Sequence, residues 1–176
     1  VTEDHSISGS FDGKAQTKWC VENAGSAVVW LAELHAPTKI PSYTLTSADD
    51  VPVRDPKEWS FEGSNDGNQW TALDKQAMPE PFANRFEEKQ FQVAAPGEHR
   101  FYRFTFIPRD PFFQLGEIRL AGIDLAGNAG VPADYRRDLN LMRGVSTTQF
   151  SVVAVSLKKK KIISKPAEDI AMRISS

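Results

Sequence analysis

The chain has 176 residues, enough for one domain with a short extension. A domain of this size can bury a hydrophobic core that is stable without disulfides or structural metals. Apolar residues make up 40% of the sequence and charged residues 25%, a composition that excludes an intrinsically disordered protein. The net charge of −2 provides no overall attraction to nucleic acid or to an anionic membrane. We therefore expect no nucleic-acid partner and disfavour a membrane partner.

The chain opens at Val1 with neither a signal sequence nor an apolar stretch long enough to span a bilayer. We expect it to be a processed or excised piece of a longer protein. Cys20 is the single cysteine, so an intrachain disulfide is excluded.

Short segments rich in aromatic and β-branched residues, bounded by Gly, Pro, Asn and Asp, predict strands separated by turns. They are residues 28–34, 43–47, 59–63, 70–73, 88–93, 101–107 and 117–120. In the segment 101–107, alternation places Tyr102 and Phe104 on the same face. Asn65-Asp66-Gly67 predicts a hairpin turn. The pattern favours an all-β sandwich or jelly roll with Trp30, Tyr102 and Phe104 in its core.

The character of the sequence changes after Gly122. A linker-like stretch leads to a predicted short helix over residues 133–142, and residues 147–157 have the composition of a strand. Ser164 before Pro166 predicts the start of a terminal helix that ends near Arg173. We divide the chain into a sandwich over residues 1–123 and an extension over residues 124–176. Three fates are open for the extension: it completes the sandwich, begins a neighbouring segment, or is partly disordered.

Four motifs in order carry a family resemblance. They are F-D-G-K-A-Q-T-K-W-C (Phe11 to Cys20), the run from Ser42 to Leu73 with G-S-N-D-G-N-Q-W-T-A-L, F-Y-R-F-T-F (Phe101 to Phe106), and Q-L-G-E-I-R-L (Gln114 to Leu120). Over residues 2–123 the chain resembles the discoidin, or coagulation factor 5/8 type C, family. The resemblance implies a galactose-binding-like β-sandwich that binds ligands without catalysis, similar to family 32 carbohydrate-binding modules.

The resemblance also implies a structural calcium site. In calcium-binding members a D-G-x-x-x-T loop and a Glu near the last strand supply oxygen ligands. The matching positions here are Asp12, Lys14 through its carbonyl, Thr17 and Glu117. Calcium prefers six to eight hard oxygen ligands, so the residue types suit it. The alternative is that Asp12 and Gly13 only form a turn and that Glu117 pairs with a nearby arginine.

A ligand site is expected on loops at the rim of the sandwich, because loops present side chains without disturbing the sheets. Phe112 and Phe113 follow Pro111 between two strands, and neighbouring rings in a strand face opposite ways, so at least one is expected to be exposed. Arg109 and Asp110 are candidate hydrogen-bonding partners for sugar hydroxyls. The alternative is that both rings cap the core.

Further ligand candidates lie in two other loops. Asn84, with its neighbour Arg85, is a candidate of the same kind as Arg109, and Arg54 opens the polar run Arg54-Asp55-Pro56-Lys57. For that run we favour a structural turn, with the Asp55 carboxylate accepting backbone N–H groups, over ligand contact.

Other conspicuous residues have structural interpretations. The four tryptophans, Trp19, Trp30, Trp59 and Trp70, are expected in the core rather than at a sugar. Cys20 is expected to be a buried, inert thiol. The lysine run 158–161 is expected to be a solvated strand end rather than a phosphate-binding patch.

The sequence thus predicts a non-catalytic carbohydrate-binding module of a larger protein, with a glycan or polysaccharide and the other domains of the parent chain as partners. The alternatives are a docking domain without a sugar site, or membrane binding through loop-tip aromatic residues. The resemblance also implies an extracellular, periplasmic or cell-surface location.

Overall fold

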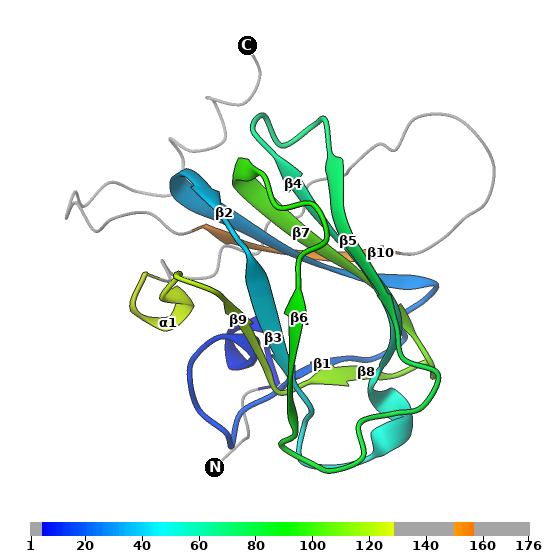
Figure 1. Ribbon diagram of the computed structural model, residues 1–176. Helices are drawn as coiled ribbons and strands as arrows, with labels where there is room; N and C mark the ends of the chain where they lie inside the picture. The colour runs from blue at the N-terminus through cyan, green and yellow to red at the C-terminus, as the bar shows by residue number, and fades with distance from the viewer. Residues whose placement is uncertain (1–4, 129–149, 157–176) are drawn as a thin grey trace, which may run out of the picture.

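A computed structural model describes residues 5–128 and 150–156, the latter as backbone. Strands account for most of the described chain, and they pack in layers across a common core (Figure 1). The elements are the 3₁₀ turns η1 (Ile7–Ser10) and η2 (Pro52–Arg54), the short helix α1 (Leu125–Asn128), and the strands β1 (Trp19–Val21), β2 (Ala27–Lys39), β3 (Ser42–Thr46), β4 (Pro56–Ser64), β5 (Thr71–Ala77), β6 (Glu88–Gln92), β7 (Glu98–Pro108), β8 (Phe113–Leu115), β9 (Glu117–Leu120) and β10 (Phe150–Ser156). The all-β prediction is confirmed.

The strands form three sheets. A five-stranded sheet has the order β10-β2-β7-β4-β5, and a three-stranded sheet has the order β6-β3-β9. A small third sheet pairs β1 with β8. All pairs are antiparallel except β10 with β2, which is parallel.

The core lies between the two larger sheets and is dominated by aromatic rings. Trp30, Tyr102 and Phe104 are fully buried, as the alternation in their strands predicts. Phe104 of β7 pairs with Trp30 on one side and with Phe61 of β4 on the other. The Phe104 and Phe61 rings stack with centroids 4.5 Å apart. Offset and tilted aromatic pairs of this kind add to the stabilisation that burial alone provides.

One polar network crosses this aromatic core. Trp59 donates its indole N–H to the Tyr43 hydroxyl at 2.8 Å, and Tyr43 donates to the Asp74 carboxylate at 2.7 Å. Gln76 donates its side-chain amide to the same carboxylate. Burial and the Asp74 carboxylate raise the pKa of Tyr43 far above its usual value. The hydroxyl therefore stays neutral and acts as a structural donor.

The structure corrects several details of the sequence prediction. β2 and β7 extend beyond the predicted limits, and β1 and β8 form a pair that the segment list lacks. Trp19, Trp30 and Trp59 are buried as predicted, but Trp70 is only half-buried. The Arg103 guanidinium stacks 4.1 Å from the Trp70 ring centroid on the outer face of the sheet. The predicted helices over 133–142 and 166–173 lie outside the described residues.

Candidate functional site

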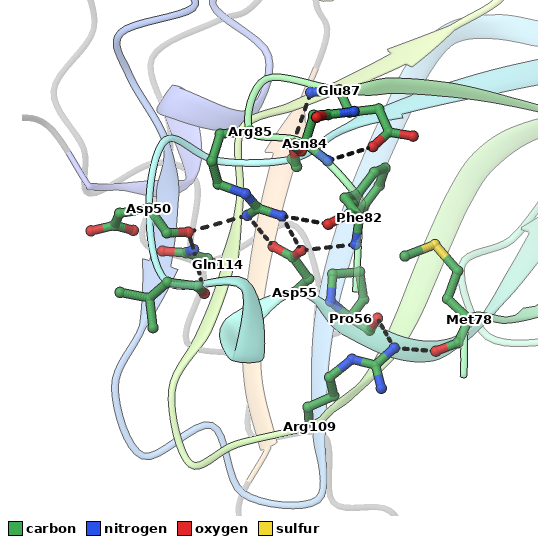
Figure 2. Close-up of polar contacts among 12 residues, drawn as sticks. Asp50, Asp55, Pro56, Met78, Phe82, Asn84, Arg85, Glu87, Arg109 and Gln114 are labelled. Atoms are coloured by element: carbon green, nitrogen blue, oxygen red, sulfur yellow. Dashed lines mark hydrogen bonds and ion pairs between the residues drawn. The ribbon is translucent and has the colours of Figure 1, made fainter. Parts of the chain in front are cut away.

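Three loops meet at one end of the sandwich, and a buried ion pair joins two of them (Figure 2). The Asp55 carboxylate, at the start of β4, has no exposed surface. Arg85 donates to both of its oxygens, at 2.9 and 2.6 Å, and the Phe82 backbone N–H donates at 3.2 Å. Arg85 also donates to the carbonyls of Asp50 and Phe82. This pair therefore fastens the loop over residues 80–87 to the loop over residues 47–55, as the structural interpretation of Asp55 predicts.

Two further side chains hold the same edge. Gln114 of β8 is fully buried and donates its amide to the carbonyls of Asp50 and Val51, at 2.6 and 3.1 Å. The Lys18 ammonium lies 2.7 Å from Asp49 and 2.8 Å from Asp50. The Lys18 side chain is 8% exposed, whereas the two aspartates are 42% and 47% exposed. Two half-exposed carboxylates are thus held in fixed positions at the rim, and sequence reasoning missed all three charges.

Phe112 and Arg54 meet at this rim. The Phe112 ring is 38% exposed, and the Arg54 guanidinium lies 4.9 Å from its centroid. The Asp110 carboxylate accepts the Phe112 backbone N–H at 3.0 Å and so shapes the turn that presents the ring. The structure therefore brings together three of the predicted ligand residues, Arg54, Asp110 and Phe112.

The donors of Arg54 distinguish it from the other described arginines. Arg85, Arg100, Arg103, Arg109 and Arg119 each donate to a carboxylate or a carbonyl of the protein. Among residues 5–128, the Arg54 guanidinium has no hydrogen-bond acceptor; it contacts the Phe112 ring, and its charge adds to that of Lys18 in lowering the pKa of Asp50. A guanidinium carries five N–H donors in a planar fork. Arg54 therefore offers its donors beside an exposed aromatic ring.

Two of the predicted ligand residues have structural roles instead. Phe113 has no exposed surface and packs edge-on against Trp19 with centroids 5.1 Å apart, so its assignment to the ligand site is wrong. It is the first residue of β8, in which all three residues are buried, whereas Phe112 lies in the loop before the strand. Arg109 donates to the backbone carbonyls of Met78 and Pro79, and the contact with Met78 is visible in Figure 2. This anchoring occupies both terminal nitrogens of the guanidinium, and its Nε is buried, so Arg109 is poorly placed to bind a sugar.

Asn84 is exposed, and its backbone, rather than its side chain, has the described contacts. Its N–H donates to Glu87 at 2.8 Å and its carbonyl accepts the Ser47 hydroxyl at 2.9 Å. The next exposed residue, Phe86, has a φ of 58° and is 49% exposed. A role of the Asn84 side chain in ligand binding therefore remains a prediction.

The predicted calcium residues converge although they are far apart in sequence. Glu117 of β9 accepts the Gly13 backbone N–H at 2.6 Å. The Asp12 carboxylate accepts the Lys14 N–H at 2.9 Å and the Thr17 hydroxyl at 2.8 Å, and the same hydroxyl lies 2.9 Å from the Lys14 carbonyl. Among the described residues Glu117 forms no ion pair with an arginine, contrary to the alternative interpretation.

The electrostatics of this cluster suit a cation. Glu117 is 7% exposed, and burial together with the neighbouring Asp12 carboxylate raises its pKa from 4.5 to about 7. The donor set consists of oxygens only, as calcium requires. In the described part of the chain, no three His, Cys, Asp or Glu side chains are grouped so that they could hold a metal ion. Carbonyl and hydroxyl oxygens would therefore have to complete the coordination shell of a calcium ion. The Lys14 ammonium lies 3.8 Å from the Asp12 carboxylate, and its side chain is 68% exposed, so it can move aside for a cation.

This raised pKa predicts a pH dependence of stability in the absence of metal. A carboxyl group whose pKa is higher in the folded state stabilises the fold below its unfolded value, near 4.5, and loses that contribution as the pH rises through about 7. In the presence of a chelator, we expect the free energy of unfolding to fall by about 2–3 kcal/mol between pH 4.5 and 7.5 through this group. Urea denaturation of the wild type and of Glu117→Gln across that range measures the difference. Parallel pH profiles of the two proteins would contradict the prediction.

Cys20 is half-buried in β1, opposite Gln114. Burial raises the pKa of its thiol, and the nearby Lys18 only partly offsets that shift. A thiol of raised pKa is a poor nucleophile at neutral pH, which agrees with an inert role. No helix in the described residues is long and apolar enough to cross a bilayer.

The sandwich and its loop rim define a module of the galactose-binding-like class, whose members include discoidin domains and carbohydrate-binding modules. The F5/8 type C domain family matches residues 1–112. The chain belongs to this family.

Three solved structures of similar fold come from bacteria. An F5/8 type C domain of Bacteroides fragilis has a TM-score of 0.57 at 15% identity and covers 66% of this chain and 80% of its own. The CBM32 module CpGH89CBM32-5 of Clostridium perfringens, in complex with GalNAc-β-1,3-galactose, has a TM-score of 0.53 at 15% identity, covering 68% and 86%. The family 32 module of C. perfringens NanJ, in complex with galactose, has a TM-score of 0.53 at 15% identity, covering 67% and 86%. At these identities the likeness establishes the fold alone.

A relative is also found among curated proteins. Over 120 residues the chain is 36% identical to a peptide-N(4)-(N-acetyl-beta-glucosaminyl)asparagine amidase of Arabidopsis thaliana. The match covers 66% of this chain but 16% of the plant enzyme. The similarity therefore concerns a small part of that enzyme.

Proposed function

We propose that this domain is a non-catalytic module that binds a glycan at the loop rim of its sandwich and thereby serves a larger protein. The observation that carries the proposal is the Arg54 guanidinium, which has no protein acceptor among the described residues and stacks on the exposed ring of Phe112. A pyranose packs its C–H face on an aromatic ring while its hydroxyls bond to planar polar groups. Asp49, Asp50 and Asp110 supply acceptors beside the ring.

The charges of the rim favour a neutral glycan. Lys18, Arg54, Arg85 and Arg109 stand against Asp49, Asp50, Asp55 and Asp110 in these loops, so the charges balance and offer no net attraction to a sugar carboxylate or sulfate. The name of the plant relative suggests N-linked glycans as the first ligands to test, with a parent protein that processes them. Galactose-terminated glycans are the second set, since the structural neighbours carry such ligands. A location outside the cytoplasm remains a prediction from the family.

A mutant series tests the rim. A shallow sugar contact is expected to bind with a Kd near 1 mM, about −4 kcal/mol. Phe112→Ala and Arg54→Gln should each weaken binding by about tenfold, because an aromatic contact or a hydrogen bond to a charged group is worth roughly 1–1.5 kcal/mol. Binding is measured by NMR titration with glycans chosen from an array.

The outer face of the five-stranded sheet offers a matched control. There Arg103 also stacks on an aromatic ring, Trp70, but its donors are taken by Glu62 at 2.7 Å. Trp70→Ala and Arg103→Gln should therefore leave glycan affinity unchanged. Equal losses in both pairs of variants would refute the rim site, and an array with no binding of any glycan would favour the docking-domain alternative.

We also propose that Asp12, Thr17, Glu117 and the Lys14 carbonyl hold a structural calcium ion. Thr17 directly precedes Lys18, whose ammonium positions Asp49 and Asp50 at the rim. An ion that orders the loop over residues 12–17 would therefore also steady the glycan site. The residues fit the ion through their oxygen donors and through the repulsion between Asp12 and Glu117 that a cation would relieve.

Calcium is expected to raise the melting temperature, since a ligand that binds only the folded state stabilises it by mass action. At 100 times the Kd the gain would be about 2.7 kcal/mol, or several degrees for a domain of this size. Thermal melts at pH 8 with calcium and with EDTA measure the effect. Asp12→Ala should abolish it, whereas Asp124→Ala, outside the cluster, should retain it. Identical melts of the wild type with and without calcium would reject the site.

A further inference from the structure

The side of β2 opposite β7 has the properties of a strand edge that needs a partner. Its first part, Ala27–Ala32, contains no charged residue and no proline, and it pairs with β7 in regular register from Val28 to Glu33. A regular, apolar edge with unpaired N–H and C=O groups is a template for pairing with another strand. Natural sheets protect such edges with charges, prolines, bulges or a short length. In β2 the register shift and Pro37 come only after Glu33.

The other outer strands of the two larger sheets carry this protection. β5 has seven residues including Asp74 and Lys75, β6 has five including Glu88 and Lys89, and β9 has four including Glu117 and Arg119. β2 has thirteen residues, and its first six, Ala27–Ala32, carry no charge. Its exposed edge is therefore an anomaly within the fold unless another strand covers it.

β10 lies on that edge. Phe150–Ser156 pairs in parallel with Ala27–Glu33 over seven residues, and Val153 stands beside Trp30 in the register. This segment is outside the region that the F5/8 type C family matches, residues 1–112. An extended segment that joins the edge of a preformed sheet through backbone hydrogen bonds is strand addition.

We propose that residues 150–156 are the built-in partner of the β2 edge, so that the folding unit of this protein extends to Ser156. Of the three fates predicted for the extension, this assigns its strand to completing the sandwich. The strand blocks an edge that would otherwise pair with a second copy of the chain. In sequence, the lysine run 158–161 follows directly, and lysines beside an apolar strand are a common guard against further pairing.

The test uses the full chain and two proline variants, Val152→Pro and Val153→Pro. Neighbouring residues of an edge strand direct their N–H groups to opposite sides, so one of the two faces β2 and the other faces away. Proline is tolerated in an edge strand only where its missing N–H would face away from the ladder. One variant should therefore lose the pairing while the other, its matched control, retains it.

Hydrogen exchange followed by NMR reads out the edge directly. Alternate amides of β2 face β7 and β10, so in the wild type both sets between Val28 and Ala32 should be protected. In the disruptive variant the set facing β10 should exchange at least about a hundredfold faster, while the set facing β7 stays slow. The same variant should elute as a dimer or larger species at concentrations where the wild type is monomeric.

Three results would overturn the proposal. They are rapid exchange of the β10-facing amides in the wild type, equal protection in both proline variants and the wild type, or protection that depends on wild-type concentration. The last result would mean that a second copy covers the edge. None of these readouts depends on glycan binding, so the proposed function can fail or succeed separately.

Discussion

Replacing Asp55 with alanine is expected to lower the free energy of unfolding by about 3–5 kcal/mol. The Asp55 carboxylate is fully buried and accepts three hydrogen bonds, two from Arg85 and one from the Phe82 backbone. Its removal leaves the Arg85 guanidinium, only 19% exposed, without its counter-charge. An uncompensated buried charge costs more than the ion pair itself contributes. Urea denaturation followed by tryptophan fluorescence measures the change.

An exposed ion pair provides the matched control for Asp55. Arg119 and Glu88 form a pair on the surface in which both side chains are more than half exposed. Glu88→Ala should change stability by less than about 1 kcal/mol. The double variant Asp55→Ala/Arg85→Met should be more stable than Asp55→Ala alone, since it removes the orphaned charge. Similar losses for Asp55→Ala and Glu88→Ala would show that the buried pair does not hold the loops.

A second substitution at Asp55 separates a residue that positions the binding loop from a residue that contacts the ligand. Asp55 does not reach the rim surface, but through Arg85 it fixes the Asp50 carbonyl and thus the loop that carries Arg54. Asp55→Asn, which retains shape and the bond from Phe82, should weaken glycan binding while its stability falls less than that of Asp55→Ala. Arg54→Gln should weaken binding without a loss of stability. This contrast identifies Asp55 as a positioning residue.

Local patterns predicted the larger sheet because its long strands β2, β4 and β7 alternate between buried and less buried residues over much of their length. Trp30, Tyr102 and Phe104 are buried where period-two alternation places them, and each strand edge carries the turn residues expected there. The convergence of Asp12 and Glu117, separated by most of the domain, followed from the family resemblance and from no local pattern. β1 and β8 are only three residues long, too short for a periodic signal.

The rim was predicted less well because loop side chains are placed by contacts distant in sequence. In the sequence, Arg109 has the type and position expected of a ligand-binding residue. In the structure, its guanidinium instead donates to the backbone carbonyls of Met78 and Pro79. Lys18 resembles a surface lysine, yet its ammonium is buried between Asp49 and Asp50. In the sequence, only the adjacent aspartates Asp49 and Asp50 mark this loop as part of the rim. In the structure, Val51, the next residue, has a φ of 28°. Such strain in a β-branched residue marks a loop fixed by its surroundings.

Phe113→Ala is expected to destabilise the domain by about 3–5 kcal/mol, whereas Phe112→Ala should cost less than about 1 kcal/mol. Phe113 is fully buried against Trp19 and Phe106, with ring centroids 5.1 and 5.3 Å away, so its truncation removes apolar burial and opens a cavity. Phe112 keeps a large exposed surface and touches Arg54.

Denaturant midpoints of the two variants, with Phe113→Leu as a partial filling of the same cavity, measure the stability difference. Phe113→Leu should recover part of the loss because the leucine side chain occupies much of the space. Glycan titration of the folded variants completes the comparison, with affinity lost in Phe112→Ala and kept in Phe113→Leu. If Phe112→Ala destabilised the domain as much as Phe113→Ala and left affinity intact, both rings would belong to the core. The rim would then lack the aromatic face on which the sugar site depends.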